Sequence, residues 1–450
     1  MFLAILFYSI TSRRKNDESK LASMQKKAVI ESRGSVSYIR ELRQLPPGVR
    51  RFFMSEPFLG AAFGLFQLLF NLHMLAYGVT EVEIGTILAA GTLMMAAAAV
   101  PAGLTADRIG RKPVLVTGLL LITAGHAAAA FGTTLAAFMG AQLLISVGMA
   151  MMVSTEIPLL YNYCRNPRQQ TQTYNLMFAL FTMFIGLGTL AGGYLPALFG
   201  EGGGAGYQQT MLVMAACTAV TAVSRMFLPA ETREKQQGWG WSSIASQRPS
   251  RNTMKYIGFS LIAGAAHGLL IPYYNVILAF RFEWTDTMIA WLLTGTGVIA
   301  SLTAFAAPVL LDKWGVRKVS VVLLIQAVLT TFLLATLLPL AVFLLFFLFR
   351  HGSFLTFVNV IEGKAMEATK DSQRSLHASL RMIGRNLGTA AGSYAAGFLL
   401  AAQAYGSIFL WTAVLIAASG IYFYWVMLPS LEDDLSLSSA ERFNQGEKRK

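Results

Sequence analysis

Residues 103–112 read Gly-Leu-Thr-Ala-Asp-Arg-Ile-Gly-Arg-Lys, and this short basic turn lies between two long apolar stretches. A degraded copy at 308–318 reads Pro-Val-Leu-Leu-Asp-Lys-Trp-Gly-Val-Arg-Lys and also joins two apolar stretches. A turn that recurs in the second half of an apolar chain predicts a membrane protein built from two homologous halves.

The composition agrees with this prediction. Of the 450 residues, 55% are hydrophobic and 13% are charged, whereas soluble domains carry roughly 25% charged residues. Apolar stretches of about 20 residues, a length that crosses roughly 30 Å of hydrocarbon, recur along the chain. The predicted fold class is an all-α integral membrane protein with 12 transmembrane helices. We place these near 55–77, 83–104, 113–133, 135–162, 173–197, 208–228, 255–280, 287–311, 318–337, 339–362, 376–402 and 406–428.

Polar stretches divide the chain into five predicted parts. None of them is long enough to bury a core, so no soluble catalytic domain is expected. The parts are a basic cytoplasmic segment at 1–52, a six-helix bundle at 53–228, a cytoplasmic linker at 229–254, a second six-helix bundle at 255–428 and a cytoplasmic tail at 429–450.

The distribution of basic residues orients the predicted helices. If both termini are cytoplasmic, nearly all of the 36 lysines and arginines lie on the cytoplasmic side, as the positive-inside rule requires. This assignment counts Arg225 with the loop residues and leaves Arg350, Arg381 and Arg385 inside spans. The net charge of +13 is then a consequence of topology, and no fold supports a nucleic-acid partner.

Further pairs of motifs support the duplication. Leu-Gly-Thr-Leu-Ala-Gly-Gly-Tyr at 187–194 returns as Leu-Gly-Thr-Ala-Ala-Gly-Ser-Tyr at 387–394. Glu156 and Arg168 recur with the same spacing as Glu362 and Arg374, and Asn71 before Thr80 is echoed by Asn275 before Thr285.

On these motifs the chain resembles the major facilitator superfamily, over about residues 53–428. The specific element is the superfamily's loop signature between spans two and three. The chain matches it completely with Gly103, Asp107, Arg108, Gly110, Arg111 and Lys112. The resemblance implies two bundles that rock about a central site. It also implies that Asp107 meets the start of span eleven and closes the inner side in the outward-facing state.

The signature residues also have physical roles of their own. Gly103 allows a neighbouring helix to approach closely, and Gly110 permits a tight turn. Asp107 at a membrane boundary needs a partner or a helix N-terminus. The second copy has Pro308 in place of the first glycine, so a weaker or purely topological gate is expected there. That copy keeps Asp312, Lys313, Gly315, Arg317 and Lys318.

Two interpretations of span five stay open. The stretch from Gly188 to Gly193 is similar to an antiporter signature of drug exporters in this superfamily, with Thr189 where proline is expected. Small residues at this spacing also serve simply to pack helices closely. Span four lacks the arginine that proton-coupled exporters carry, since 142–148 contains none. Both departures count against drug/proton antiport.

Charges inside the membrane are candidates for a binding or coupling site. One interpretation pairs Glu362 with Arg381 or Arg385, and Glu156 with Arg165 or a loop arginine, as latches between helices. The other places Arg350 and Arg385 in the central cavity, where they would attract an anionic substrate. Three intramembrane arginines against two glutamates leave one positive charge without a partner.

Polar groups in the first and seventh spans are further candidates. His73 and His267 are preferred over His126 as titrating histidines, because spans one and seven line the cavity in the superfamily. Asn71 and Asn275 lie near them and can hydrogen-bond a solute. Glu156 and His73 are the first candidates for carrying a proton.

The predicted function is secondary active transport of a small solute by alternating access, with proton-coupled export of drugs or metabolites as the first hypothesis. An organic-anion transporter that uses the intramembrane arginines is the second, and a receptor or sensor that binds a solute without moving it is the third. The sequence contains no catalytic set, no P-loop and no metal-ligand spacing. We therefore expect no enzyme activity and no cofactor, and an ion or proton gradient as the energy source. The protein is expected in the plasma or inner membrane, and the resemblance to the superfamily implies a monomer.

Overall fold

The computed structural model describes residues 45–200, 204–231, 251–369 and 374–429. The chain divides into two compact units, Met1–Arg50 and Arg51–Lys450. The helices belong to the second unit, apart from the first residues of α3. Most of the predicted leader (1–52), linker (229–254) and tail (429–450) lies outside the described residues.

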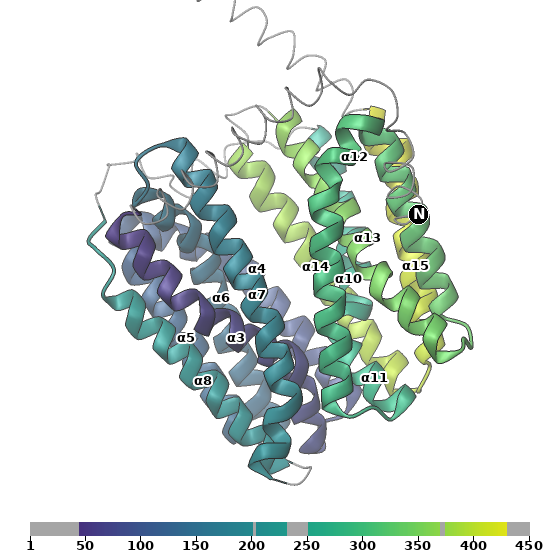
Figure 1. Ribbon diagram of the computed structural model, residues 1–450, viewed down its shortest axis with the longest axis horizontal. Coiled ribbons are helices and arrows are strands. Elements are labelled where there is room, and N and C mark those ends of the chain that lie inside the picture. The colour runs from purple at the N-terminus through teal and green to yellow at the C-terminus, as the bar shows by residue number, and fades with distance from the viewer. Residues whose placement is uncertain (1–44, 201–203, 232–250, 370–373, 430–450) are drawn as a thin grey trace, which may run out of the picture. The chain divides into compact units, whose positions relative to one another are not determined.

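The described residues form helices and no strands (Figure 1). Threonine and asparagine side chains begin several of them, because their oxygens accept from the free N–H groups of the first turn. Thr80 and Glu83 form a capping box at the start of α4, and Asn166 caps α7. The first half contains α3 (Pro47–Ala76), α4 (Glu81–Ile109), α5 (Arg111–Phe131), α6 (Leu135–Asn162), α7 (Pro167–Phe199) and α8 (Gly204–Met226).

The second half repeats this order with two irregularities. Its first helix is broken by a 3-10 turn, and its second continues into its third across a bend. Thr285 caps α12 as Thr80 caps α4, which confirms the predicted repeat register. The elements are α10 (Arg251–Leu270), η1 (Ile271–Tyr273), α11 (Tyr274–Phe282), α12 (Asp286–Leu334), α13 (Leu340–Ala368), α14 (Arg374–Ala401), α15 (Tyr405–Tyr422) and η3 (Phe423–Met427).

The two copies of the basic turn have the same backbone. Gly110 ends α4 with φ 105° and ψ 154°, and Gly315 bends α12 with φ 74° and ψ 165°. Both glycines have a positive φ, a backbone conformation that residues with a Cβ rarely adopt. The predicted loop between spans 287–311 and 318–337 is therefore a sharp bend at one glycine.

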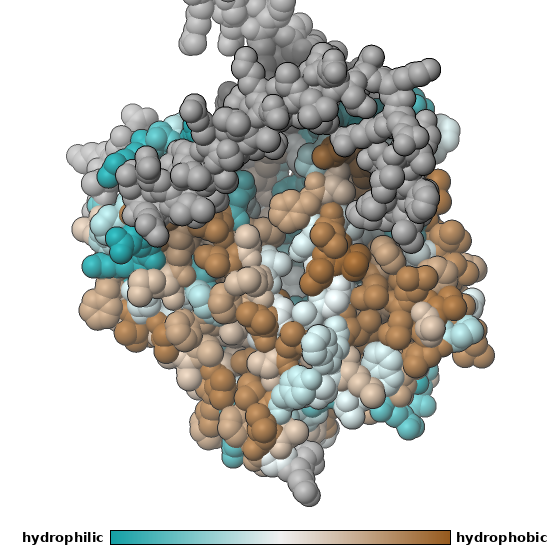
Figure 2. Space-filling model, viewed as in Figure 1, coloured by the Kyte–Doolittle hydropathy of each residue, from teal (hydrophilic) through white to brown (hydrophobic). Residues whose placement is uncertain are grey.

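Nine helices in the described part of the chain are long and apolar enough to cross a membrane. The helices α8 and α14 have 23 and 28 residues but are less apolar and are not among the nine. Large apolar side chains such as Phe305, Leu198 and Trp425 lie exposed, and apolar surface covers much of the view in Figure 2. An exposed apolar surface of this kind indicates that the helices are surrounded by the hydrocarbon chains of a lipid bilayer.

Glycines let the first helix of each half touch the fifth. A Cβ on Gly64 of α3 would collide with the backbone of α7 at Ile185. In the second half, a Cβ on Gly388 of α14 would collide with the carbonyl oxygen of Leu261 in α10. The related stretches 187–194 and 387–394 thus both allow two helix backbones to come into contact, which supports the packing interpretation of span five.

We predict that Gly388→Ala destabilises the protein, because the new methyl group has no room between two backbones. Overpacking of this kind costs about 1–3 kcal/mol, so the midpoint of thermal unfolding in detergent should fall by several degrees. The matched control is Gly297→Ala in α12, where a Cβ meets nothing within 4 Å. Equal midpoints for the two variants would contradict the close crossing.

Candidate functional site

The interface between the two six-helix halves is called the seam below. Two asparagines related by the repeat close one end of it. The Asn71 side chain donates to the carbonyl oxygen of Pro272 at 2.7 Å. The Asn275 side chain donates to the carbonyl oxygen of Leu68 at 2.6 Å. Both asparagines are buried. The helix break at η1 makes the first bond available, because the Val276 N–H donates to the side chain of Asn275 and not to a carbonyl one turn back.

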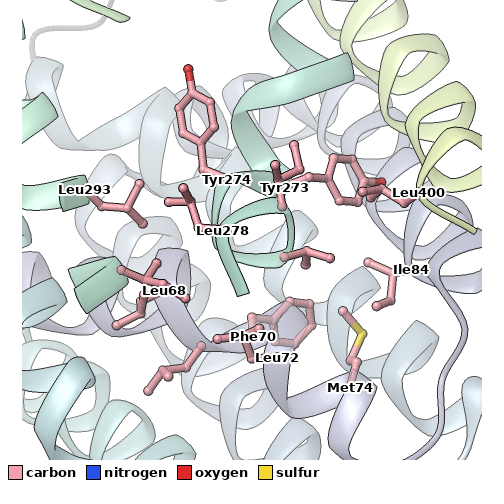
Figure 3. Packing of buried hydrophobic residues seen from close by; sticks show 14 of the residues in the cluster. Leu68, Phe70, Leu72, Met74, Ile84, Tyr273, Tyr274, Leu278, Leu293 and Leu400 are labelled. Atoms are coloured by element: carbon pink, nitrogen blue, oxygen red, sulfur yellow. The ribbon is translucent and has the colours of Figure 1, made fainter. Parts of the chain in front are cut away.

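Apolar packing continues the closure at this end. In Figure 3, Tyr273 and Tyr274 project in different directions from the same helix break, Tyr273 toward Leu400. Helices α4 and α14 approach at glycines, since a Cβ on Gly85 would lie 3.1 Å from the Cα of Gly397. The halves are therefore tightly closed at this end.

Further hydrogen bonds reinforce the same end of the seam. The Thr287 hydroxyl of α12 donates to the carbonyl oxygen of Gly193 in α7 at 2.6 Å. The Tyr207 hydroxyl of α8 lies 3.2 Å from a carboxylate oxygen of Asp286. From here the helices of the two halves diverge toward the opposite end (Figure 1).

The loop signature lies at the opposite end and contacts its own half. Asp107 is exposed, and no hydrogen bond or ion pair links it to a described residue. A Cβ on Gly103 would meet nothing within 4 Å, so the predicted close approach at Gly103 is wrong for this conformation. Asp312 of the second copy is likewise exposed, and Arg317 bonds the hydroxyl of Tyr424.

Two basic residues of the signature bind backbone groups. Arg111 donates through Nη1 to the carbonyl oxygen of Pro158 in α6 at 3.3 Å, and its backbone N–H donates to Glu231 at 2.8 Å. Lys112 donates to the carbonyl oxygen of Leu228 at 2.6 Å. These contacts tie the loop to the ends of α6 and α8.

A cavity of about 160 Å³ lies within the first half, between α3, α4, α5 and α6. Two of its four polar side chains, Gln142 and Ser146, come from α6. Gln142 donates weakly to the Ser146 hydroxyl at 3.5 Å, and its buried Oε1 has no partner among the described residues. The lining consists of Phe63, Phe66, Gly91, Thr92, Met95, Ile122, His126, Gln142, Ile145, Ser146 and Met149.

A buried cluster of three charges lies near the loop signature. Arg225 is fully buried and bonds Glu56 at 2.6 Å and Glu156 at 2.5 Å. The assignment of Arg225 to a cytoplasmic loop is therefore wrong, because the last turn of α8 carries this side chain into the bundle. Of the predicted partners of Glu156, Arg165 or a loop arginine, the structure shows Arg225, which had been counted with the loop residues.

In the second half, the charges are arranged differently. Glu362 lies 2.7 Å from Arg381 and 3.9 Å from Arg385, so the predicted pairing is present. Arg350 is fully buried and makes no ion pair with a described residue. Its guanidinium bonds the hydroxyl of Tyr274 and, at 3.1 Å, that of Thr331, while Nη2 has no partner in the described part of the chain.

The histidines do not follow the predicted order of preference. His73 lies 3.0 Å from the carbonyl oxygen of Ala129 and packs edge-on against the Phe138 ring, so it is a packed core residue. His126, which was ranked lower, lines the cavity. His267 is partly buried in α10.

Comparison with known proteins identifies the family. The Major Facilitator Superfamily model matches residues 52–255 and 256–446. The chain belongs to the major facilitator superfamily. It is therefore a membrane transporter of small solutes and not an enzyme.

The chain is also similar to a bacterial resistance protein. The Methylenomycin A resistance protein of Bacillus subtilis (strain 168) is 24% identical over 215 residues, which span 47% of this chain and 43% of that protein. The alignment thus covers less than half of the relative's length.

Solved structures show the same fold. The nucleoside transporter NupG superposes with a TM-score of 0.70 at 14% identity, covering 84% of this chain and 100% of that one. A bacterial homologue of the human lysosomal transporter Spinster, in an inward-facing and unoccupied conformation, has a TM-score of 0.71 at 11% identity, covering 86% and 97%.

Sequence reasoning about this transporter missed three residues. Glu56 is an acid inside the first predicted span, 55–77, and an intramembrane acid is itself a signal. Arg225 also fell within a predicted span but was treated as a loop residue. Gln142 gave no signal, because its unsatisfied oxygen depends on where α4 and α6 pack.

We predict that Asn71→Ala and Asn275→Ala each open the closed end of the seam. Each substitution removes a buried hydrogen bond worth about 1 kcal/mol, which shifts an equilibrium between two conformations roughly fivefold. Spin labels at Ala76→Cys and Glu283→Cys, on a background with serine in place of Cys164 and Cys217, report the distance across this end. An unchanged distance distribution in the Asn71→Ala, Asn275→Ala double variant would show that these two hydrogen bonds do not hold this end closed.

Proposed function

We propose that this transporter exports a largely apolar organic compound across the cell membrane in exchange for protons. The observation that carries the proposal is the cavity in the first half. Phenylalanine, isoleucine and methionine side chains form most of its wall, and no charged side chain lines it among the described residues. An apolar pocket with few polar groups selects a ligand of the same character.

The polar groups of the cavity restrict the ligand further. The unpartnered Oε1 of Gln142 accepts a hydrogen bond, so a ligand with one N–H or O–H donor satisfies it. His126 supplies a second polar contact beside Phe66, whose ring lies 5.7 Å from the imidazole. We expect a neutral or weakly polar ring compound with a donor group. The resemblance to a resistance protein supports export as the direction.

Twelve membrane spans account for the described helices under this proposal. The nine apolar helices are joined by α8 and α14, and the bend at Gly315 divides α12 into two spans. With both termini on the cytoplasmic side, the closed end faces outward and the loop signature faces the cytoplasm. The conformation described is then inward-facing.

Alternating access follows from this arrangement. Closing the cytoplasmic end brings Asp107 toward the start of α14, where the positive end of the helix dipole stabilises a carboxylate. Opening the outer end breaks the bonds of Asn71 and Asn275. The transporter acts as a monomer and draws its energy from the gradient.

We predict that Gln142→Leu weakens binding of neutral aromatic compounds roughly three- to tenfold, since one hydrogen bond contributes about 1 kcal/mol. Ligand-induced thermal stabilisation of the purified protein measures this, over a panel of neutral, cationic and anionic compounds. Gln169→Leu, on the partly exposed first turn of α7, is the control.

Uptake into proteoliposomes against a pH gradient separates transport from binding alone. Compounds that stabilise the protein but are never moved would identify a receptor or sensor. Stabilisation that is equal in both glutamine variants would exclude the cavity as the binding site.

Transport of an organic anion is the second candidate. It is favoured by Arg350, a buried cation that no described carboxylate neutralises and whose Nη2 is unpartnered. A buried charge of this kind is costly unless a ligand pairs with it. Arg385, whose side chain is 47% exposed, would attract the anion toward this site.

We predict for this candidate that benzoate stabilises the wild-type protein against heat and that Arg350→Gln abolishes the stabilisation. The control is Arg165→Gln at an exposed position. If benzoate stabilises the Arg350→Gln variant as well as the wild type, the anion candidate is wrong.

A further inference from the structure

Two carboxylates share one guanidinium inside the first half. Arg225 Nη2 lies 2.6 Å from Glu56 Oε1, and Arg225 Nη1 lies 2.5 Å from Glu156 Oε1. Arg225 Nε donates to the Ser55 hydroxyl at 3.2 Å, and the Phe52 ring centroid lies 4.6 Å from the guanidinium carbon. The guanidinium is therefore fully engaged by these groups.

The cluster carries one excess negative charge if both glutamates are ionised. Arg225 and Glu56 are 0% and 1% exposed, and the Glu156 side chain is 14% exposed. An uncompensated charge in such surroundings is strongly unfavourable, and two carboxylates that share one buried cation favour the uptake of a proton by one of them. We propose that Glu56 and Glu156 together bind one proton at neutral pH and form the proton-coupling site of this transporter.

The other charged and titratable groups nearby do not neutralise the pair. Arg51 of α3 donates to the carbonyl oxygen of Phe227. From α5, Arg111 and Lys112 bind Glu231 and backbone carbonyl oxygens.

Beyond the end of α6, the Tyr163 hydroxyl donates to the carbonyl oxygen of Pro229 at 2.9 Å. Burial, with the negative charge of Glu231, raises the pKa of Tyr163 to about 12, so the phenol stays protonated. Arg225 is then the cation that the two glutamates contact in the described part of the chain.

The repeat supplies a natural comparison. Glu156 and Glu362 occupy equivalent positions in the two halves, but Glu362 pairs with two arginines, Arg381 and Arg385. One carboxylate between two guanidiniums leaves no excess negative charge. The first half therefore has the charge balance of a proton site, and the second half has that of a fixed ion cluster.

The geometry also indicates how the proton enters and what it affects. Glu156 is the more exposed acid, so exchange with water proceeds through it while Glu56 stays enclosed. Two residues farther along α6, the carbonyl oxygen of Pro158 accepts from Arg111 of the loop signature. Proton binding at Glu156 thus acts on the helix end that holds the loop. This link to transport rests on the proposed function; the proton site itself does not.

Infrared spectroscopy of the purified full-length protein in lipid nanodiscs tests the site without any solute. We expect the carbonyl stretching band of one protonated carboxyl group at neutral pH, shifted in heavy water. The band should disappear in Glu56→Gln or in Glu156→Gln, since each variant leaves one carboxylate for one guanidinium. It should persist in the matched control Glu362→Gln and in Asp286→Asn.

The outcomes are distinct. Absence of the band in folded wild-type protein overturns the proposal whatever the variants do, and so does a band lost only in Glu362→Gln or Asp286→Asn. Size-exclusion chromatography identifies a variant that fails to fold, and the other glutamate variant then decides the assignment. Because no solute is used, a failure here leaves the cavity proposal intact, and the Gln142 variant tests that separately.

Discussion

A charge inside a membrane protein has to find its partner within the protein, because hydrocarbon offers none. This constraint explains the position of almost every intramembrane ion described here. Glu362 lies between Arg381 and Arg385, and Arg225 lies between Glu56 and Glu156. Arg350 is the exception, since it is held by two hydroxyl groups. Under our proposals, a proton completes the balance of charge at the first cluster and an anionic ligand would complete it at Arg350.

The lack of hydrogen-bond partners in the hydrocarbon also explains the contacts that helices make with each other's backbones. At the closed end, Asn71 and Asn275 bond carbonyl oxygens of the opposite half, so each half satisfies a polar group of the other. Where helices cross within a half, Gly64 and Gly388 remove the side chain so that two backbones meet. Both devices occur in each half, which shows that the duplication preserved the packing while the buried charges diverged.

The divergence of charge gives the two halves different tasks under the proposed function. The first half contains the apolar cavity and two acids on one guanidinium, so it is suited to a neutral solute and a proton. The second half carries the excess of arginine. Because the basic loop signature bonds α6 beside Glu156, the proton site and the gate are neighbours in one half. Coupling between them then needs only the end of one helix to move.

Much of the fold is readable in the sequence, because apolar length, glycine turns and basic loops are local properties. The motif at 103–112 and its copy at 308–318 predicted the duplication, the family and the tight turn at Gly110. The site was predicted only in part. The pairing of Glu362 followed from spacing on neighbouring helices, but the partner of Glu156 did not, since Arg225 lies far along the chain. Tertiary structure alone decided that Arg225 is buried, that His126 and not His73 lines the cavity, and that Gln142 keeps an unpartnered oxygen. Each of these three facts depends on which face of a helix packs against a neighbouring helix. Because the helices are apolar on every face, the sequence does not indicate which face that is.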